Sequence, residues 1–133
     1  MNVIAVVDER NGTLFNHRRQ SRDRVLTECI LQRCGGELFV TPYTAGLFAG
    51  TGARLTVADD PFAAAGKDDW CFAEDLPLAP VRKKMGRLVL YRWDRVYPAD
   101  RTLDLDLASL RPVSTVEFAG YSHEKITEEI YVP

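Results

Sequence analysis

Residues 3–12 read Val-Ile-Ala-Val-Val-Asp-Glu-Arg-Asn-Gly, an apolar run that stops at a polar turn. An uninterrupted run of β-branched residues and alanine is typical of a central strand that is covered on both faces. Asn11-Gly12 follows directly and is a strong turn signal. The first strand is therefore expected in the middle of a sheet that has other elements packed on both sides.

The rest of the sequence predicts many short strands and few helices. One strong helix is expected between the first two strands, from a cap at Ser21 to a stop at Gly35-Gly36, with Asp23 in its first turn. Further strands are expected at 37–41, 54–58, 70–73, 87–96, 110–118 and 126–132, and short helical turns at 44–48, 62–65 and 81–85. This pattern predicts a single α/β domain over residues 1–133, with a mixed, mostly parallel β-sheet flanked by few helices.

The composition is that of one domain of ordinary polarity. The chain has 133 residues, of which 46% are hydrophobic and 27% charged, and its formal net charge is -2. So small a net charge gives no long-range attraction to nucleic acid or to membranes, and no apolar run approaches the roughly 20 residues of a membrane helix. Three cysteines without a framework spacing predict reduced thiols in a cytoplasmic protein.

The basic run 15–24, which reads Phe-Asn-His-Arg-Arg-Gln-Ser-Arg-Asp-Arg, gives the strongest indication of function. It places four arginines and a histidine within ten residues, at an expected helix start where free N–H groups and the helix dipole attract anions. Arginine forks hold carboxylate or phosphate oxygens bidentately. The run predicts a site for a small anionic or nucleotide-like ligand, built from Asn16, His17, Arg18, Arg19, Arg22 and Asp23. The alternative is a solvated loop whose arginines pair with acids such as Asp8 or Glu9.

The order of the elements resembles that of dihydrofolate reductase over most of the chain. Residues 3–12 are similar to that family's first strand and the turn after it, and 88–92 to a late strand. The loop and acidic stretch at 97–107 and the segment 126–131 are similar to the parts that follow it. The resemblance implies the family's sheet, and it places Asp23 near the position of the carboxylate that engages the pterin ring.

The cofactor motifs of that family are missing from this chain. Where the family has a Gly-Arg pair that binds cofactor phosphate, this sequence has Thr41-Pro42-Tyr43-Thr44. The Gly-Gly pair that approaches the pyrophosphate has no counterpart, because the adjacent glycines here, Gly35-Gly36, end a helix. The Pro-Trp of the substrate loop is also missing. A dinucleotide needs amide donors around its phosphates, so neither a cofactor nor NADPH-dependent reduction is expected.

The run from Asn11 to Asp23 also resembles small bacterial proteins that are labelled ribonuclease Z. A ribonuclease Z holds two zinc ions with a His-x-His-x-Asp-His cluster, whereas this chain has two histidines, His17 and His123, outside any such cluster. Two-metal hydrolysis needs several ligands for each ion. The sequence therefore predicts no metal site.

Three functional classes stay open at this point, and ligand binding leads. An enzyme, either a residual reductase or a hydrolase, would use Asp23, His17 or His123 as acid–base groups. The arginines beside Asp23 favour its charged form and oppose proton donation near neutral pH. A protein- or RNA-interaction module would instead use the basic run as its contact surface.

Overall fold

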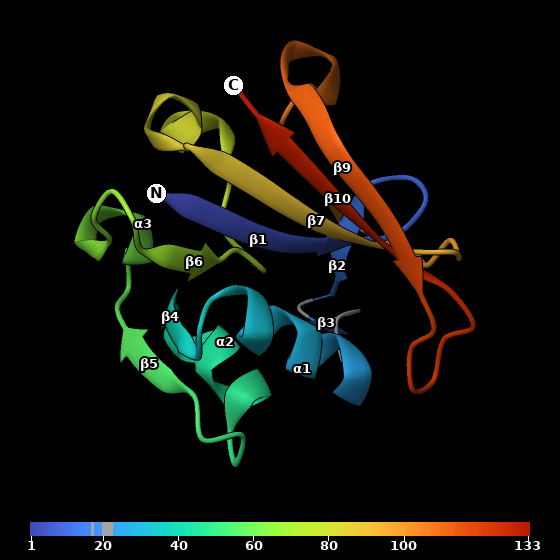
Figure 1. Ribbon diagram of the computed structural model, residues 1–133, viewed down its shortest axis with the longest axis horizontal. Coiled ribbons are helices and arrows are strands. Elements are labelled where there is room, and N and C mark those ends of the chain that lie inside the picture. The colour runs from blue at the N-terminus through green and yellow to red at the C-terminus, as the bar shows by residue number, and fades with distance from the viewer. Residues whose placement is uncertain (17, 20–22) are drawn as a thin grey trace.

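A seven-stranded sheet runs through the computed structural model, which describes residues 1–16, 18–19 and 23–133 (Figure 1). Its strand order is β5-β4-β6-β1-β7-β10-β9. The strands are β1 (Asn2–Val7), β4 (Glu37–Val40), β5 (Arg54–Val57), β6 (Trp70–Phe72), β7 (Arg87–Trp93), β9 (Arg111–Phe118) and β10 (Ile126–Val132). Pairing is parallel from β5 to β7 and antiparallel on both sides of β10. The mixed, mostly parallel sheet predicted from the sequence is confirmed.

A second, smaller sheet follows the turn after β1. It consists of β2 (Gly12–Phe15) between β3 (Arg18–Arg19) and β8 (Arg101–Thr102). The sequence placed Arg18 and Arg19 directly before the helix, whereas they pair in register with Phe15 and Leu14 of β2. Asn16 enables the reversal of the chain with a left-handed backbone, at φ 49°, a conformation that asparagine tolerates better than most residues.

The strong helix predicted from the sequence is α1 (Arg24–Arg33). Asp23 is its N-cap, with an extended backbone and with a carboxylate that accepts from the Val25 and Leu26 amides. The prediction of Asp23 inside the first turn is therefore wrong, because aspartate caps helices as well as serine does. The predicted cap, Ser21, lies outside the described residues. The helix ends before Gly35-Gly36 as predicted, and both glycines have positive φ.

The remaining helical segments are short. They are α2 (Pro42–Ala45), η1 (Gly46–Phe48), α3 (Pro61–Ala64), η2 (Ala79–Lys84) and η3 (Leu107–Ser109). Among the described residues, no helix has the length and apolar character that crossing a membrane requires.

The large sheet separates two apolar cores. The core under α1 contains Leu26 and Ile30 with Ile4, Val6, Val89, Tyr91 and Trp93 of the sheet. The core on the other face contains Leu78 and Met85 with Val3, Ala5, Val7, Leu88 and Leu90. Alternate residues of a strand point to opposite faces, so β1 contributes to both cores. Its continuous apolar run is explained by this double burial.

The connections from β1 and β6 leave the sheet in opposite directions. From β1 the chain passes through α1 to β4 on one side, and from β6 it passes through η2 to β7 on the other. The two strands are adjacent and parallel. In open α/β sheets, such a topological switch point creates a crevice outside the carboxyl ends of the strands, where ligands bind.

Candidate functional site

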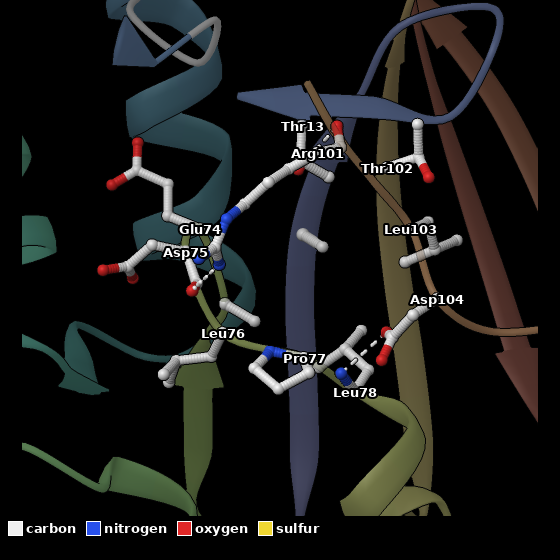
Figure 2. A pocket seen from close by; sticks show the side chains of 12 residues that line it. Thr13, Glu74, Asp75, Leu76, Pro77, Leu78, Arg101, Thr102, Leu103 and Asp104 are labelled. Atoms are coloured by element: carbon white, nitrogen blue, oxygen red, sulfur yellow. Dashed lines mark hydrogen bonds between the residues drawn. The ribbon is translucent and has the colours of Figure 1, made fainter. Parts of the chain in front are cut away.

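A hollow of about 220 Å³ lies at this switch point (Figure 2). Two small side chains, Ala5 of β1 and Ala73 after β6, line it where the strands end. Its other apolar walls come from Leu76, Pro77, Leu78 and Leu103. Thr13 and Thr102 add hydroxyl groups from the small sheet. A mostly apolar hollow with a few polar groups is the usual form of a small-molecule site.

Arg101 of β8 crosses the mouth of the hollow toward the loop after β6 (Figure 2). Its Nη1 donates a hydrogen bond to the Asp75 carbonyl at 2.6 Å. The Arg101 carbonyl accepts from Thr13 Oγ1 at 3.2 Å, which holds the backbone of β8 beside β2. Within the described residues, no carboxylate forms an ion pair with this guanidinium. Its remaining N–H groups can therefore serve an anion.

Asp104 stands beside Arg101 in the wall of the hollow, but its carboxylate has partners of its own. Its oxygens accept from the Leu78 amide at 2.8 Å and from the Ala79 amide at 3.0 Å. These are amides at the start of η2, where a negative charge is stabilised. Asp104 therefore stabilises the short helix and does not pair with the Arg101 guanidinium.

The loop after β6 contributes two further carboxylates, and both are engaged inside the protein. Glu74, only 7% exposed, lies 3.0 Å from Arg19 Nε and accepts from Thr44 Oγ1 at 2.9 Å. Asp75 accepts from Thr41 Oγ1 at 3.3 Å. In Figure 2 both side chains point away from Arg101's side of the hollow. Their charges hold the loop against α2 and β3.

Arg19 of the basic run is engaged in contacts inside the protein. Besides its ion pair with Glu74, Arg19 donates to the Tyr43 carbonyl at 2.9 Å and lies 4.5 Å from the centre of the Tyr43 ring. The sequence suggested Asp8 or Glu9 as internal partners for these arginines. The buried Asp8 instead accepts from backbone amides, including that of Gly12.

Other members of the basic run are spread over the surface. Arg24 lies over the Tyr121 ring at 4.4 Å, and Arg18 is exposed on β3. The Asn16 amide donates to Asp100 Oδ2 at 3.0 Å. Arg18, Arg24 and the Asn16 amide therefore face different surroundings. Two further predicted ligand residues, His17 and Arg22, lie outside the described residues.

Asp23 has a saturated, buried carboxylate. Its Oδ1 accepts from the amides of Val25, Leu26 and Tyr121, and its Oδ2 accepts from the Ser122 amide, Ser122 Oγ and His123 Nδ1, all at 2.9–3.2 Å. Burial alone would raise the pKa of Asp23, but the hydrogen bonds from His123 and the backbone amides outweigh it and hold the pKa well below its usual range. The charged form was predicted from the neighbouring arginines, and the hydrogen bonds to the carboxylate stabilise it.

His123 is brought against Asp23 from a loop that the sequence left without a clear role. The imidazole stacks on Trp93, with ring centres 3.9 Å apart and 17° between the planes. Its Nε2 lies 2.9 Å from Tyr97 Oη. Of the predicted acid–base groups, Asp23 and His123 thus meet, and Tyr97 joins them. No spacing in the sequence indicates Tyr97 or Arg101, because loops far apart in the chain bring them into place.

The space between α1 and β7 is filled by large side chains. Tyr91 and Trp93 are fully buried. Tyr91 Oη donates to Glu128 at 2.8 Å, and Glu128 also pairs with Arg33 of α1 at 2.5 Å. Among the described residues, no three histidine, cysteine, aspartate or glutamate side chains gather as a metal ion would require.

This architecture, with an open sheet, a switch point at β1 and β6 and a closing antiparallel pair, is the dihydrofolate reductase fold. No family model matches the sequence, and no curated protein matches it. Among solved structures, the dihydrofolate reductase from Enterococcus faecalis complexed with NADP(H) and RAB-propyl is similar, with a TM-score of 0.68. The match covers 98% of this chain and 94% of that chain at 10% sequence identity. The fold expected from the sequence is confirmed, and the likeness concerns the fold alone.

Proposed function

We propose that the protein binds a small anion with an apolar body in the switch-point hollow, and that Arg101 holds the anionic group. The observation that supports this most is a guanidinium at the mouth of an apolar hollow with only a backbone carbonyl as its partner within the described residues. Arginine suits carboxylate and phosphate oxygens. The proposal keeps the anionic or nucleotide-like ligand predicted from the sequence and moves its site from the basic run to β8.

The size of the hollow limits the ligand. Its volume of about 220 Å³ is below the roughly 300 Å³ at which sites for drug-sized ligands begin. A single ring with a carboxylate or phosphate group satisfies this limit, as does the base of a pyrimidine nucleotide. A dinucleotide exceeds it.

NADPH-dependent reduction is left out of the proposal because amides at three of the described helix starts are already capped within the chain. Asp104 accepts from the first amides of η2, Thr41 Oγ1 accepts from the Thr44 amide of α2 at 3.3 Å, and Asp23 caps α1. Phosphate binding at a helix start depends on such amides. Titration with NADPH, followed by nucleotide fluorescence, should show no saturable binding, and saturation would contradict this part of the proposal.

The binding site is tested by calorimetric titration with benzoate, inorganic phosphate and uridine 5′-monophosphate. Benzamide serves as the uncharged counterpart of benzoate. We expect at least one anion to bind and benzamide to bind at least about tenfold more weakly than benzoate, because it lacks the charge that Arg101 would hold.

Two matched variants locate the anion. Arg101→Met removes the guanidinium at the hollow, and Arg18→Met removes an exposed one from the basic run. We expect about a tenfold or greater loss of affinity in Arg101→Met and an unchanged affinity in Arg18→Met. A loss of affinity in Arg18→Met with an unchanged affinity in Arg101→Met would place the anion at the basic run. If none of the anions gave binding heat, ligand binding of this class would be refuted.

A further inference from the structure

Three side chains from distant parts of the chain form a continuous hydrogen-bonded series outside the hollow. Asp23 Oδ2 lies 3.0 Å from His123 Nδ1, and His123 Nε2 lies 2.9 Å from Tyr97 Oη. The side chain of Asp23 is fully buried and that of His123 is 9% exposed, whereas Tyr97 is partly exposed. The series therefore leads from a buried carboxylate to the hydroxyl of a partly exposed side chain.

The protonation of His123 follows from its partners. A carboxylate only accepts hydrogen bonds, so Nδ1, which faces Asp23, carries the proton. Ser122 Oγ lies 3.2 Å from Nδ1 and 3.0 Å from Asp23 Oδ2, and it donates to the carboxylate. In the neutral imidazole, the lone pair is then on Nε2 and points at Tyr97 Oη. This is the tautomer that a base needs to accept the phenol proton.

The imidazole is also fixed in orientation. Trp93 covers one face of the ring. Gly120 lets the loop approach closely, since a Cβ at this position would lie 3.0 Å from Asp23 Oδ2 and 3.1 Å from the His123 carbonyl oxygen. A nucleophile beside a base that is oriented by a third group is the geometric signature of an activated hydroxyl.

We propose that Tyr97 is an activated hydroxyl that accepts acyl groups from small activated acyl donors. His123 acts as the base, and Asp23 is a positioning residue, as in other series of carboxylate, imidazole and hydroxyl. Tyr97 Oη attacks the acyl carbon, so that a C–O bond forms while the bond to the leaving group breaks. The phenol proton passes to His123 Nε2 and then to the leaving group, which departs in neutral form.

Acetylation of the native protein by N-acetylimidazole tests the proposal, with the modified tyrosines identified and timed by peptide mass spectrometry. Tyr121 is the internal control because it is 67% exposed and lies outside the series. Accessibility alone predicts that Tyr121 reacts faster. With a base in place, Tyr97 should react at least about tenfold faster than Tyr121, a modest share of what general bases contribute. A Tyr97 rate equal to or below that of Tyr121 would overturn the proposal.

Two variants distinguish activation of Tyr97 by His123 from other effects of the surroundings of Tyr97. His123→Gln should reduce the Tyr97 rate to that of Tyr121 or below, whereas Glu124→Gln, at the exposed next residue of the same loop, should leave the ratio of the two rates unchanged. Circular dichroism and thermal unfolding establish that each variant is folded. A ratio that persists in folded His123→Gln would show that His123 is not the base.

The positioning role of Asp23 has its own test. Asp23→Asn removes the negative charge 3.0 Å from His123 Nδ1, so the ratio of the Tyr97 rate to the Tyr121 rate should fall in the folded variant, and Asp23→Glu, which restores the charge, should recover part of it. An unchanged ratio in a folded Asp23→Asn variant would leave Asp23 with the helix cap alone and would contradict its part in the series.

Discussion

The space on one side of β1 is open, whereas the space on the other side is filled by side chains. On the switch-point side, Ala5 and Ala73 leave a hollow where β1 and β6 end. On the α1 side, Tyr91 and Trp93 fill the space under the helix and are fully buried. Both regions belong to one sheet, so the difference comes from side-chain size and not from backbone topology. The fold supplies positions, and individual residues decide which of them stays open to a ligand.

The largest expected effect is on the filled side. Trp93→Ala should lower the free energy of unfolding by about 3–5 kcal/mol, because it empties a fully buried site and removes the ring that covers His123. Leu103→Ala, in the wall of the hollow, should cost less than about 1.5 kcal/mol, since Leu103 is only partly buried beside a space already open. Urea unfolding measures both free energies. Equal losses of stability in the two variants would contradict the proposed difference between the two sides.

The cap at the start of α1 should rank second. Asp23→Asn should lower the free energy of unfolding at pH 7 by about 2–3 kcal/mol, because one amide oxygen and an NH2 group replace two oxygens that accept from six donors. Asp68→Asn, at an exposed turn residue, should change it by less than about 0.5 kcal/mol.

The Asp23 carboxylate also determines part of how the free energy of unfolding depends on acid pH. The pKa of Asp23 is lower in the folded protein than its ordinary value near 3.9. Its stabilisation is therefore complete above that value and is lost as the pH falls toward the folded pKa. The free energy of unfolding should fall from about pH 5 to about pH 2, and less steeply in Asp23→Asn. Parallel curves for wild type and variant would contradict the low pKa.

The polar edge of the hollow should show a smaller effect. Arg19→Met removes a partner of Glu74 in a pair whose side chains are 12% and 4% exposed, and it should cost about 1–2 kcal/mol. Arg54→Met breaks the Arg54–Glu37 pair, whose side chains are 84% and 68% exposed, and should cost less than about 0.5 kcal/mol. Equal costs in thermal unfolding would place the Arg19 pair in the same class as a surface pair.

The smallest effect tests the open side directly. Ala73→Val adds two methyl groups next to free space and should change the free energy of unfolding by less than about 0.5 kcal/mol while weakening ligand binding at the hollow. Val89→Ile adds one methyl group to a fully buried side chain of the core under α1. It should cost about 1–3 kcal/mol through overpacking. A larger cost for Ala73→Val than for Val89→Ile would show that the hollow is already packed.

The sequence predicts the elements better than it predicts the site, because elements follow local rules. The apolar run of β1, the apolar periodicity of α1 and the Gly35-Gly36 stop are all local signals, and each corresponds to the structure. The internal ion pair of Arg19 could not be predicted, for the opposite reason. The arginines of the basic run were counted without Glu74, whose carboxylate arrives from a loop after a much later strand. No local pattern in the sequence marks Arg101 as a binding residue, since only the pairing of β8 with β2 brings it to the hollow.

The anchoring of α1 has a consequence for how the chain folds during synthesis. The start of the helix is tied to His123, 100 residues further along, and its last turn is tied through Arg33 to Glu128, 95 residues further along. Contacts between such distant residues form late and slow the folding of small domains. On the ribosome, α1 is made early, and these two contacts at its ends can form only after the loop before β10 and β10 itself have been made.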